Sequence, residues 1–353
     1  MSKENEFRES DLPRDIAEAA DAALAEVIPE KSKDNYEKVY NAYQEWKIRK
    51  GITVTCEKVL FAYFKEQSEK YKPTTLWSQF SKLKCMINLK EKINVDKFAE
   101  MTAFLKQKSR GYNPKKSKVF SSQQIQNFLE NAPNEHDLDK KVIILFGIFG
   151  AFRGGELTNV TIKDIERQGS LYCVKVPTTK TMKPRSFVIP GEYCSLIDKY
   201  IKLRPTRVTT DRFFLNYQKG KCTVQVIGKN KIAAVPQKVA EFLNLTDPEN
   251  YTGHSFRRTS ATMLVDAGAD LMMLKRHGGW KSSAVAEGYV EESMANKKEI
   301  GSLFSKMIDM PSTSASVQMS VETTAGPSKI LPNEMLKDKN FNFTNCNITF
   351  NLK

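Results

Sequence analysis

Between residues 32 and 110, apolar positions recur with the period of an α-helix. Tyr36, Val39, Tyr40 and Tyr43 recur at positions i, i+3, i+4 and i+7, so they form one buried stripe. Three further amphipathic helices follow, and Thr55 is expected to cap the first of these. Their apolar positions are Val59, Leu60, Tyr63 and Phe64, then Leu76, Phe80, Leu83 and Ile87, and last Phe98, Met101 and Leu105. Four short amphipathic helices predict a small all-helical domain over residues 32–110.

From residue 119 to residue 308 the pattern mixes helical and strand periods. A capping box at Ser121 and Gln124 opens one helix, and residues 142–149 are apolar on every face, which predicts a central buried helix. Residues 171–176 alternate and are rich in β-formers, which predicts a strand paired with residues 187–189. Further elements are expected at 193–201 (helix), 213–216 (strand), 229–243 (helix, with Pro236 at a start or kink) and 293–308 (amphipathic helix). The predicted fold class is mainly α with a small β-hairpin or sheet, in which a mixed α+β domain follows the helical one.

Three segments flank or join these domains. Residues 1–31 are rich in Glu, Asp and Ala and predict an acidic flexible arm, within which residues 15–28 could form one helix. Residues 111–118 combine structure breakers with dense positive charge, which predicts a basic interdomain linker. The basic residues of this linker are Lys115, Lys116 and Lys118. Residues 309–353 predict a polar, Asn-rich tail.

Composition narrows the class of function. The chain has 353 residues and a formal net charge of +14, an excess that favours a polyanionic partner and above all nucleic acid. Six cysteines include no Cys-x-x-Cys pair, and only three histidines are present, so we expect neither a metal site nor a disulfide framework. The N-terminus is polar and no apolar run approaches the length of a membrane span, so we expect neither secretion nor membrane insertion.

Candidate chemistry gathers between Gly253 and Tyr289. His254 and Arg257 are three residues apart, so they share one helix face and can present a proton-transfer group and a fork of donors to one phosphate. Trp280 precedes Tyr289 by nine residues, and a phenol can attack a phosphate and become covalently attached to it. Each residue alone also fits a plainer role, such as a core histidine, a salt-bridge arginine, a core tryptophan or a surface tyrosine.

This stretch resembles the C-terminal half of the active site of the tyrosine recombinases, the phage integrase superfamily. His254 and Arg257 match the His-x-x-Arg of that family. Trp280 matches its His-or-Trp position and Tyr289 matches its nucleophile. His277 is the alternative to Trp280, and the spacing to Tyr289 favours Trp280. The surroundings look like recombinases of eukaryotic mobile elements, the crypton-like group, rather than bacterial ones.

The resemblance extends to two earlier segments. Arg153 and Glu156 stand in a Gly-x-x-Arg-x-x-Glu-Leu pattern, which implies that Arg153 is the first catalytic arginine and that Glu156 supports it. In this superfamily a β-hairpin carries the catalytic lysine, often in a Lys-Thr pair. Lys180 is assigned on that basis, with Lys183 as the alternative. Without the other motifs, an ordinary exposed hairpin lysine would be the preferred interpretation.

The resemblance implies an enzyme without metal or cofactor that cuts and rejoins double-stranded DNA through a 3′-phosphotyrosyl intermediate. Residues 32–110 would form a core-binding domain, with Lys82, Lys84 and the linker lysines at phosphates, although such polar faces are often only solvated. The helix over residues 293–308 would dock onto a neighbouring protomer of a tetramer. The basic linker is also a candidate nuclear address, so we expect a nuclear protein.

Two other functions fit parts of this pattern. A gene captured from a mobile element could keep the fold as a DNA- or chromatin-binding protein that no longer cuts DNA. A DNA-relaxing enzyme of type IB would share the chemistry without needing an ordered tetramer. The presence of all six groups favours the strand-transfer enzyme; they are Arg153, Lys180, His254, Arg257, Trp280 and Tyr289.

Overall fold

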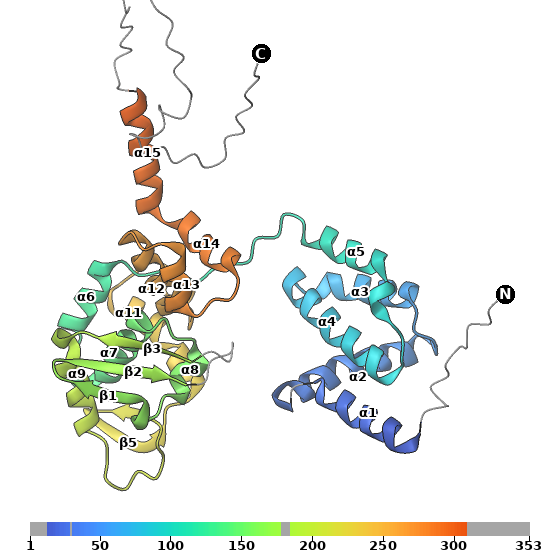
Figure 1. Cartoon of the computed structure of the whole chain (residues 1–353), viewed down its shortest axis with the longest axis horizontal. Helices are drawn as coiled ribbons and strands as arrows, with labels where there is room; N and C mark the ends of the chain where they lie inside the picture. Colours follow the sequence, from blue (N-terminus) through green and yellow to red (C-terminus); the bar gives the residue numbers. More distant parts are fainter. Residues whose placement is uncertain (1–12, 29, 178–183, 309–353) are drawn as a thin grey trace, which may run out of the picture.

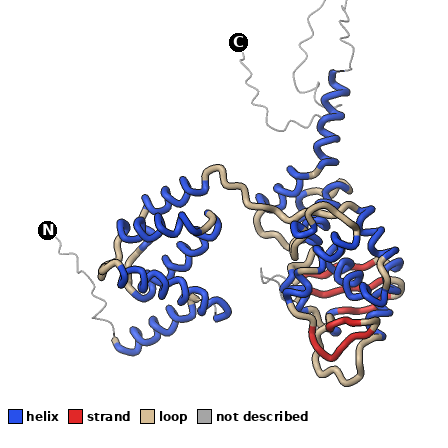
Figure 2. Tube along the Cα trace, turned by 180° about the vertical axis from the view of Figure 1, so that it is seen from behind, coloured by secondary structure: helices blue, strands red, loops and turns tan. Residues whose placement is uncertain are grey.

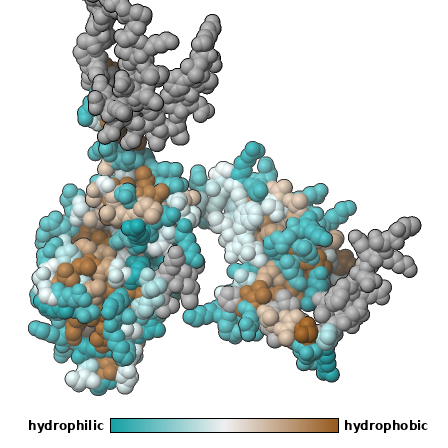
Figure 3. Space-filling view, in the orientation of Figure 1, coloured by the Kyte–Doolittle hydropathy of each residue, from teal (hydrophilic) through white to brown (hydrophobic). Residues whose placement is uncertain are grey.

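The chain folds into two helix-rich bodies joined by an extended linker (Figure 1). The computed structural model describes residues 13–28, 30–177 and 184–308. Among these residues, strands occur only in the second body (Figure 2). Hydrophilic side chains cover much of the face of both bodies drawn in Figure 3. The predicted class, mainly α with a small amount of antiparallel sheet, is confirmed.

The first body is a helical cluster around an aromatic core. Its elements are α1 (Arg14–Glu26), η2 (Glu30–Ser32), α2 (Lys33–Arg49), α3 (Glu57–Lys70), α4 (Pro73–Lys90), η3 (Val95–Lys97) and α5 (Ala99–Ser109). Tyr43 and Phe64 are fully buried, and Trp46 packs edge-on against Tyr63. The predicted apolar residues of α2 to α5 are all buried or half-buried, and all except Tyr36 pack in this core. The helical periodicity therefore predicted the packing of this body correctly.

The cap predicted at the start of α3 is wrong. Cys56 occupies the N-cap position and makes no side-chain capping hydrogen bond. The Thr55 hydroxyl instead accepts a hydrogen bond from Lys47 Nζ at 2.9 Å. It also accepts one from the Tyr43 hydroxyl at 3.3 Å. Thr55 thus joins α3 to α2, and this tertiary use outweighs its local preference for capping.

The end of the linker is anchored on the second body. The Lys118 N–H donates to the Asn250 carbonyl at 3.0 Å, and its ammonium group bonds Asp247 Oδ2 at 2.9 Å. The Ser117 hydroxyl bonds the hydroxyl of Thr252. Residues 117–118 therefore lie against the loop that leads into His254.

The second body packs helices around small antiparallel sheets. Its helices are α6 (Ser122–Asn131), α7 (Asn134–Phe149), α8 (Gly154–Asn159), η4 (Ile162–Asp164), α9 (Gly191–Lys202), α10 (Lys229–Ala233), α11 (Val235–Phe242), η5 (Pro248–Asn250), α12 (Ser255–Asp266), α13 (Leu271–Gly278), α14 (Ser283–Glu292) and α15 (Met294–Ile308). One sheet has the order β1 (Ile165–Gln168), β2 (Leu171–Val176), β3 (Arg185–Ile189), and a second pairs β4 (Leu215–Gln218) with β5 (Lys221–Val226). The predicted buried helix is α7, which packs against α9, α12 and β3.

Most elements predicted for the second body form where they were expected. The capping box at Ser121 and Gln124 is present, and β2 pairs with β3, with Tyr172 opposite Ile189. Pro236 lies in the first turn of α11, where the predicted helix divides into α10 and α11. Strand β4 begins at Leu215, two residues later than predicted. Strands β1 and β5 were not predicted.

The last described helix, α15, extends away from the second body (Figure 1). It forms where an amphipathic helix was predicted, and its apolar residues Ile300, Leu303, Phe304 and Ile308 are exposed. Within the described ranges, no helix has the length and apolar character needed to cross a membrane. The Asn-rich tail lies outside the described residues.

Candidate active site

A tight turn between α7 and α8 presents Arg153. A Cβ on Gly150 would lie 2.6 Å from the rings of Phe152 and Phe187, so only glycine fits there. Ala151 takes a left-handed conformation, with φ at 42°, and Phe152 is buried. This turn leaves Arg153 at the N-cap position of α8, with 22% of its side chain exposed.

Glu156 holds Arg153 in place. One carboxylate oxygen accepts from the Arg153 N–H at 3.0 Å, and the other accepts from the Arg153 guanidinium at 2.7 Å. Burial acts to raise the pKa of Glu156, but hydrogen bonds from Arg153 and the charge of Arg185 outweigh it and hold the pKa below its ordinary value. Glu156 is therefore ionised at neutral pH and fixes the orientation of the Arg153 side chain.

Arg185 is part of this network, and the sequence analysis did not single it out. Its guanidinium bonds Glu156 Oε2 at 2.8 Å and also donates to the carbonyls of Gly150 and His277. A signal was present in the sequence, because Arg185 shares the inward-facing positions of β3 with Phe187 and Ile189. A charged residue on a buried strand face needs a charged partner, and Glu156 is that partner.

Arg257 bonds the backbone carbonyls that directly follow the two bonded by Arg185. It donates to the carbonyl of Ala151, and to that of Gly278 at 2.6 Å. Arg185 and Arg257 together therefore join the turn at 150–153 to the end of α13. Burial, followed by the charge of Arg153, lowers the pKa of Arg257 to about 10, so this guanidinium stays protonated at neutral pH.

His254 stands at the N-cap position of α12, one turn before Arg257, and is exposed. Partial desolvation lowers its pKa, and the positive charges of Arg257, Arg153 and Arg258 lower it further. The imidazole is consequently neutral at pH 7 and able to accept a proton. Arg153 and Arg257 therefore both act on this ring through their charges.

Trp280 connects Arg257 to Tyr289. The Arg257 guanidinium lies 4.5 Å from the centre of the Trp280 ring, and the Trp280 and Tyr289 rings lie 5.1 Å apart, tilted by 43°. Gly278 is required here, because a Cβ would overlap the Trp280 ring at 2.0 Å. Tyr289 is half-buried on α14.

His277, the alternative to Trp280, faces the interior. Its Nε2 lies 2.6 Å from the hydroxyl of Ser260, and burial lowers its pKa to about 4. It is a neutral core histidine held against α12. Of the two alternatives, the structure places Trp280 against Tyr289.

The structure describes the predicted DNA-binding lysines but not the two candidates for the catalytic lysine. Lys180 and Lys183 lie outside the described residues. Lys118 is paired with Asp247, and Lys84 is paired with Asp96. Lys115 and Lys116 are exposed in the linker and Lys82 is half-buried on α4. The surface ion pairs of Lys118 and Lys84 are weak enough to be exchanged for a phosphate, but neither lysine is preset for one.

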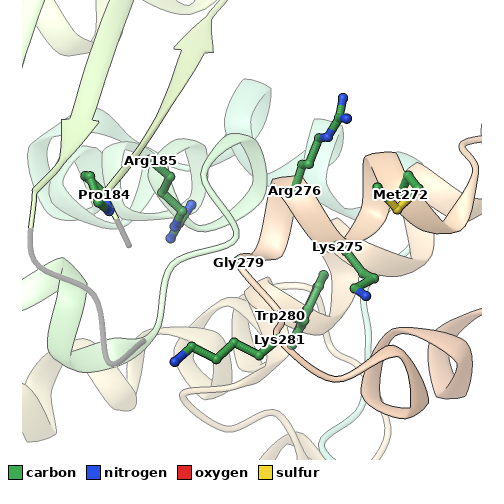
Figure 4. Close-up of a pocket in the computed structure, with 8 residues that line it drawn as sticks. All are labelled: Pro184, Arg185, Met272, Lys275, Arg276, Gly279, Trp280 and Lys281. Carbon is green, nitrogen blue, oxygen red and sulfur yellow. The ribbon is translucent and has the colours of Figure 1, made fainter. Parts of the chain in front are cut away.

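Beside these residues an open pocket of about 610 Å³ lies between the start of β3 and the end of α13 (Figure 4). Its lining residues are Pro184, Arg185, Met272, Lys275, Arg276, Gly279, Trp280 and Lys281. Within the part of the chain that the structure describes, no group of three or more His, Cys, Asp or Glu could hold a metal ion.

Solved structures of recombinases and integrases share this fold. One is the XerH site-specific recombinase bound to palindromic difH substrate in a post-cleavage complex, at 17% identity and TM-score 0.55, covering 71% of this chain and 73% of that one. Another is the Tn1549 transposon integrase in complex with a circular intermediate DNA, at 16% identity and TM-score 0.54, covering 74% and 90%. A third is a lambda integrase dimer bound to a COC′ core site, at 15% identity and TM-score 0.50, covering 77% and 93%.

These likenesses establish the fold of a tyrosine recombinase. The model of the phage integrase family matches residues 118–296, about half of the chain, and the chain therefore belongs to that family. A search of curated proteins finds no match. The expected family is confirmed, whereas the narrower crypton-like placement stays a prediction.

Proposed function

We propose that this protein is a DNA strand-transfer enzyme that cuts and rejoins double-stranded DNA through a phosphotyrosine at Tyr289. Membership of the phage integrase family supports recombination as the activity. The observation that carries the proposal is the continuous arrangement from Arg257 through Trp280 to Tyr289. Arg153 and His254 share the electrostatic environment of Arg257.

In the proposed reaction the Tyr289 hydroxyl attacks the scissile phosphorus and passes its proton to neutral His254. A bond forms between the phenolic oxygen and phosphorus, and the bond from phosphorus to the 5′-oxygen breaks. Lys180 gives the departing 5′-oxygen a proton, so that it leaves as a hydroxyl. Arg153 and Arg257 donate to the non-bridging oxygens, whose negative charge grows in the transition state.

The charge balance of the site suits this reaction. Arg153, Arg185 and Arg257 carry three positive charges, of which Glu156 neutralises one while His254 is neutral. Arg258, over the Tyr289 ring, adds further positive charge. The site is therefore net positive, which favours the negative charge that a phosphodiester gains as the tyrosine attacks. Glu156 bonds both Arg153 and Arg185. The Arg153 guanidinium is therefore held in one orientation and preorganised for the phosphate.

The first body supplies the other half of a DNA clamp in this proposal, and the basic linker crosses the duplex between the two bodies. The exposed apolar face of α15 docks onto a neighbouring copy of the chain in a tetramer. A groove of about 490 Å³ between α6, α7, α9 and α12 is the acceptor we assign, lined by Ile125, Leu129, Ile148, Phe149, Tyr193 and Met263. Glu130 and Glu192 on this groove complement the exposed Lys297 and Lys298 of α15. Nuclear DNA is the proposed substrate.

A strand-exchange assay tests this function. Two duplexes that carry a site recovered by binding selection, one of them labelled, should yield recombinant strands without metal ion or ATP. The matched control is Tyr289→Phe, which removes only the attacking hydroxyl and should bind DNA while exchanging no strands. If the wild type binds the selected site but neither cuts nor exchanges strands, the protein is a non-catalytic DNA-binding relative.

A further inference from the structure

Half of the residues that line the open pocket between β3 and α13 are basic. Arg185, Lys275, Arg276 and Lys281 line it, and no carboxylate is among its lining residues in the described part of the chain. Arg276 and Lys281 are exposed, while Lys275 is held by a hydrogen bond of 2.9 Å to the Ser283 hydroxyl. Arg185 is paired with Glu156 behind the pocket, so the positive charge that faces the open space is that of Lys275, Arg276 and Lys281. This excess of positive charge favours binding of an anion.

The floor of this pocket contains an unsatisfied donor. The Arg185 side chain is only 9% exposed, and its Nε–H is buried without a hydrogen-bond partner among the described residues. A Cβ on Gly279 would lie 3.9 Å from this nitrogen, and Figure 4 shows the Arg185 side chain directed toward Gly279. Buried donors are nearly always paired, so this one stands out among the described residues next to the pocket.

Trp280 forms the wall between this pocket and the candidate active site. The same indole lines the pocket, packs on Tyr289 and lies over Arg257. A ligand in the pocket is therefore one ring removed from the phosphate that Tyr289 is proposed to attack. The volume of about 610 Å³ is that of a typical small-ligand site, which is enough for a nucleotide unit.

We propose that this pocket binds a second phosphate of the DNA backbone, next to the one that Tyr289 attacks. Arg276 and Lys281 bind it from the rim, the charge of Arg185 attracts it from the floor, and Met272 and Trp280 contact the attached sugar. This second phosphate fixes the register of the strand, so that the scissile phosphate lies opposite Tyr289. The inference rests on the proposed function for the identity of the strand.

Neutral-linkage scanning tests the pocket. The full-length chain is bound to its selected duplex, in which single backbone phosphates are replaced one at a time by uncharged methylphosphonates. In the wild type, one linkage beside the cleavage position should weaken binding about tenfold, the scale of one charge-assisted hydrogen bond. In the double variant Arg276→Met and Lys281→Met, the same linkage should cause no further loss, because its partners are gone.

The control variant removes equal charge elsewhere. Arg167→Met and Lys202→Met lie on β1 and α9, outside the pocket, and should leave the effect of the sensitive linkage intact. If neutralising each phosphate weakens DNA binding by the double variant as much as it weakens binding by the wild type, the pocket binds no phosphate. Because the readout is binding, this result is separate from a failure of cleavage, which would overturn the proposed function instead.

Discussion

Replacing Glu156 with glutamine tests the charge network behind Arg153. The Glu156 carboxylate is 5% exposed and accepts hydrogen bonds from Arg153 and Arg185 at 2.7 to 3.0 Å. Glutamine keeps the shape of the side chain but removes its charge and turns one acceptor into a donor that faces a guanidinium. We expect Glu156→Gln to destabilise the second body and to weaken the preorganisation of Arg153.

The magnitude follows from burial. Removing one partner of a buried ion pair costs roughly 3–5 kcal/mol, and the lower end, about 3 kcal/mol, applies because Arg153 keeps part of its side chain in water. For a domain of this size each kcal/mol corresponds to about 2–4 °C, so we expect the Tm to fall by roughly 6–12 °C.

The same change should alter the dependence of stability on pH. The folded-state pKa of Glu156 lies below its ordinary value, so its ionisation stabilises the fold. This contribution is present above the pKa of the unfolded chain and is lost as the pH falls through the lower pKa of the folded protein. The stability difference between wild type and Glu156→Gln should therefore be largest near neutrality and should narrow below roughly pH 4.

Urea unfolding at several pH values measures both effects. Glu166→Gln is the matched control, because Glu166 is about half-exposed and lies 3.5 Å from the exposed Lys175. The control should change the free energy of unfolding by less than about 1 kcal/mol. An equal loss in both variants, or a loss in Glu156→Gln that does not narrow in acid, would refute the role given to Glu156.

Three further predictions concern the phosphate, the linker and the last helix. Arg153→Ala and Arg257→Lys should each slow cleavage of a selected duplex by about 10² or more, because a preorganised donor to the oxyanion is lost; normal cleavage by both would contradict the site. Lys115→Glu with Lys116→Glu should weaken DNA binding and reduce its salt dependence by about one unit of slope per lost phosphate contact, as measured in a salt titration; an unchanged slope would remove the linker from the interface. Deleting residues 293–353 should abolish strand exchange while leaving DNA binding within a few-fold of wild type, and full exchange by the truncated chain would rule out docking through α15.

The parts of the fold that were predictable are those where burial has a local period. The stripe that ends at Tyr43 and the alternation of β2 both record which face is buried, so periodicity alone identified them. Strand β1 shows no alternation of apolar and polar residues, because three of its four residues are exposed. It is held by backbone pairing with β2, which leaves no pattern in the sequence. Strand β5 is similarly exposed over most of its length.

The site shows the same limit more sharply. The order and spacing of His254, Arg257, Trp280 and Tyr289 could be read from one stretch of the chain. The partners of Arg185 could not, since Glu156 is 29 residues away and His277 is 92 residues away in sequence. Only the inward position of Arg185 on β3 indicated that a charged partner was required. Contacts between distant turns are set by the packing of the whole body and leave little local trace.

The central claim is that Tyr289 becomes covalently attached to DNA. The most direct measurement uses selected duplexes nicked close to the cleavage position, so that the released 5′-end diffuses away and the intermediate accumulates. After denaturation, mass spectrometry of the digested adduct should show a nucleotide attached through its 3′-phosphate to the peptide that contains Tyr289. Tyr289→Phe should bind the same DNA without forming an adduct. A wild-type protein that binds specifically and forms no adduct, or an adduct that persists in Tyr289→Phe, would contradict the account.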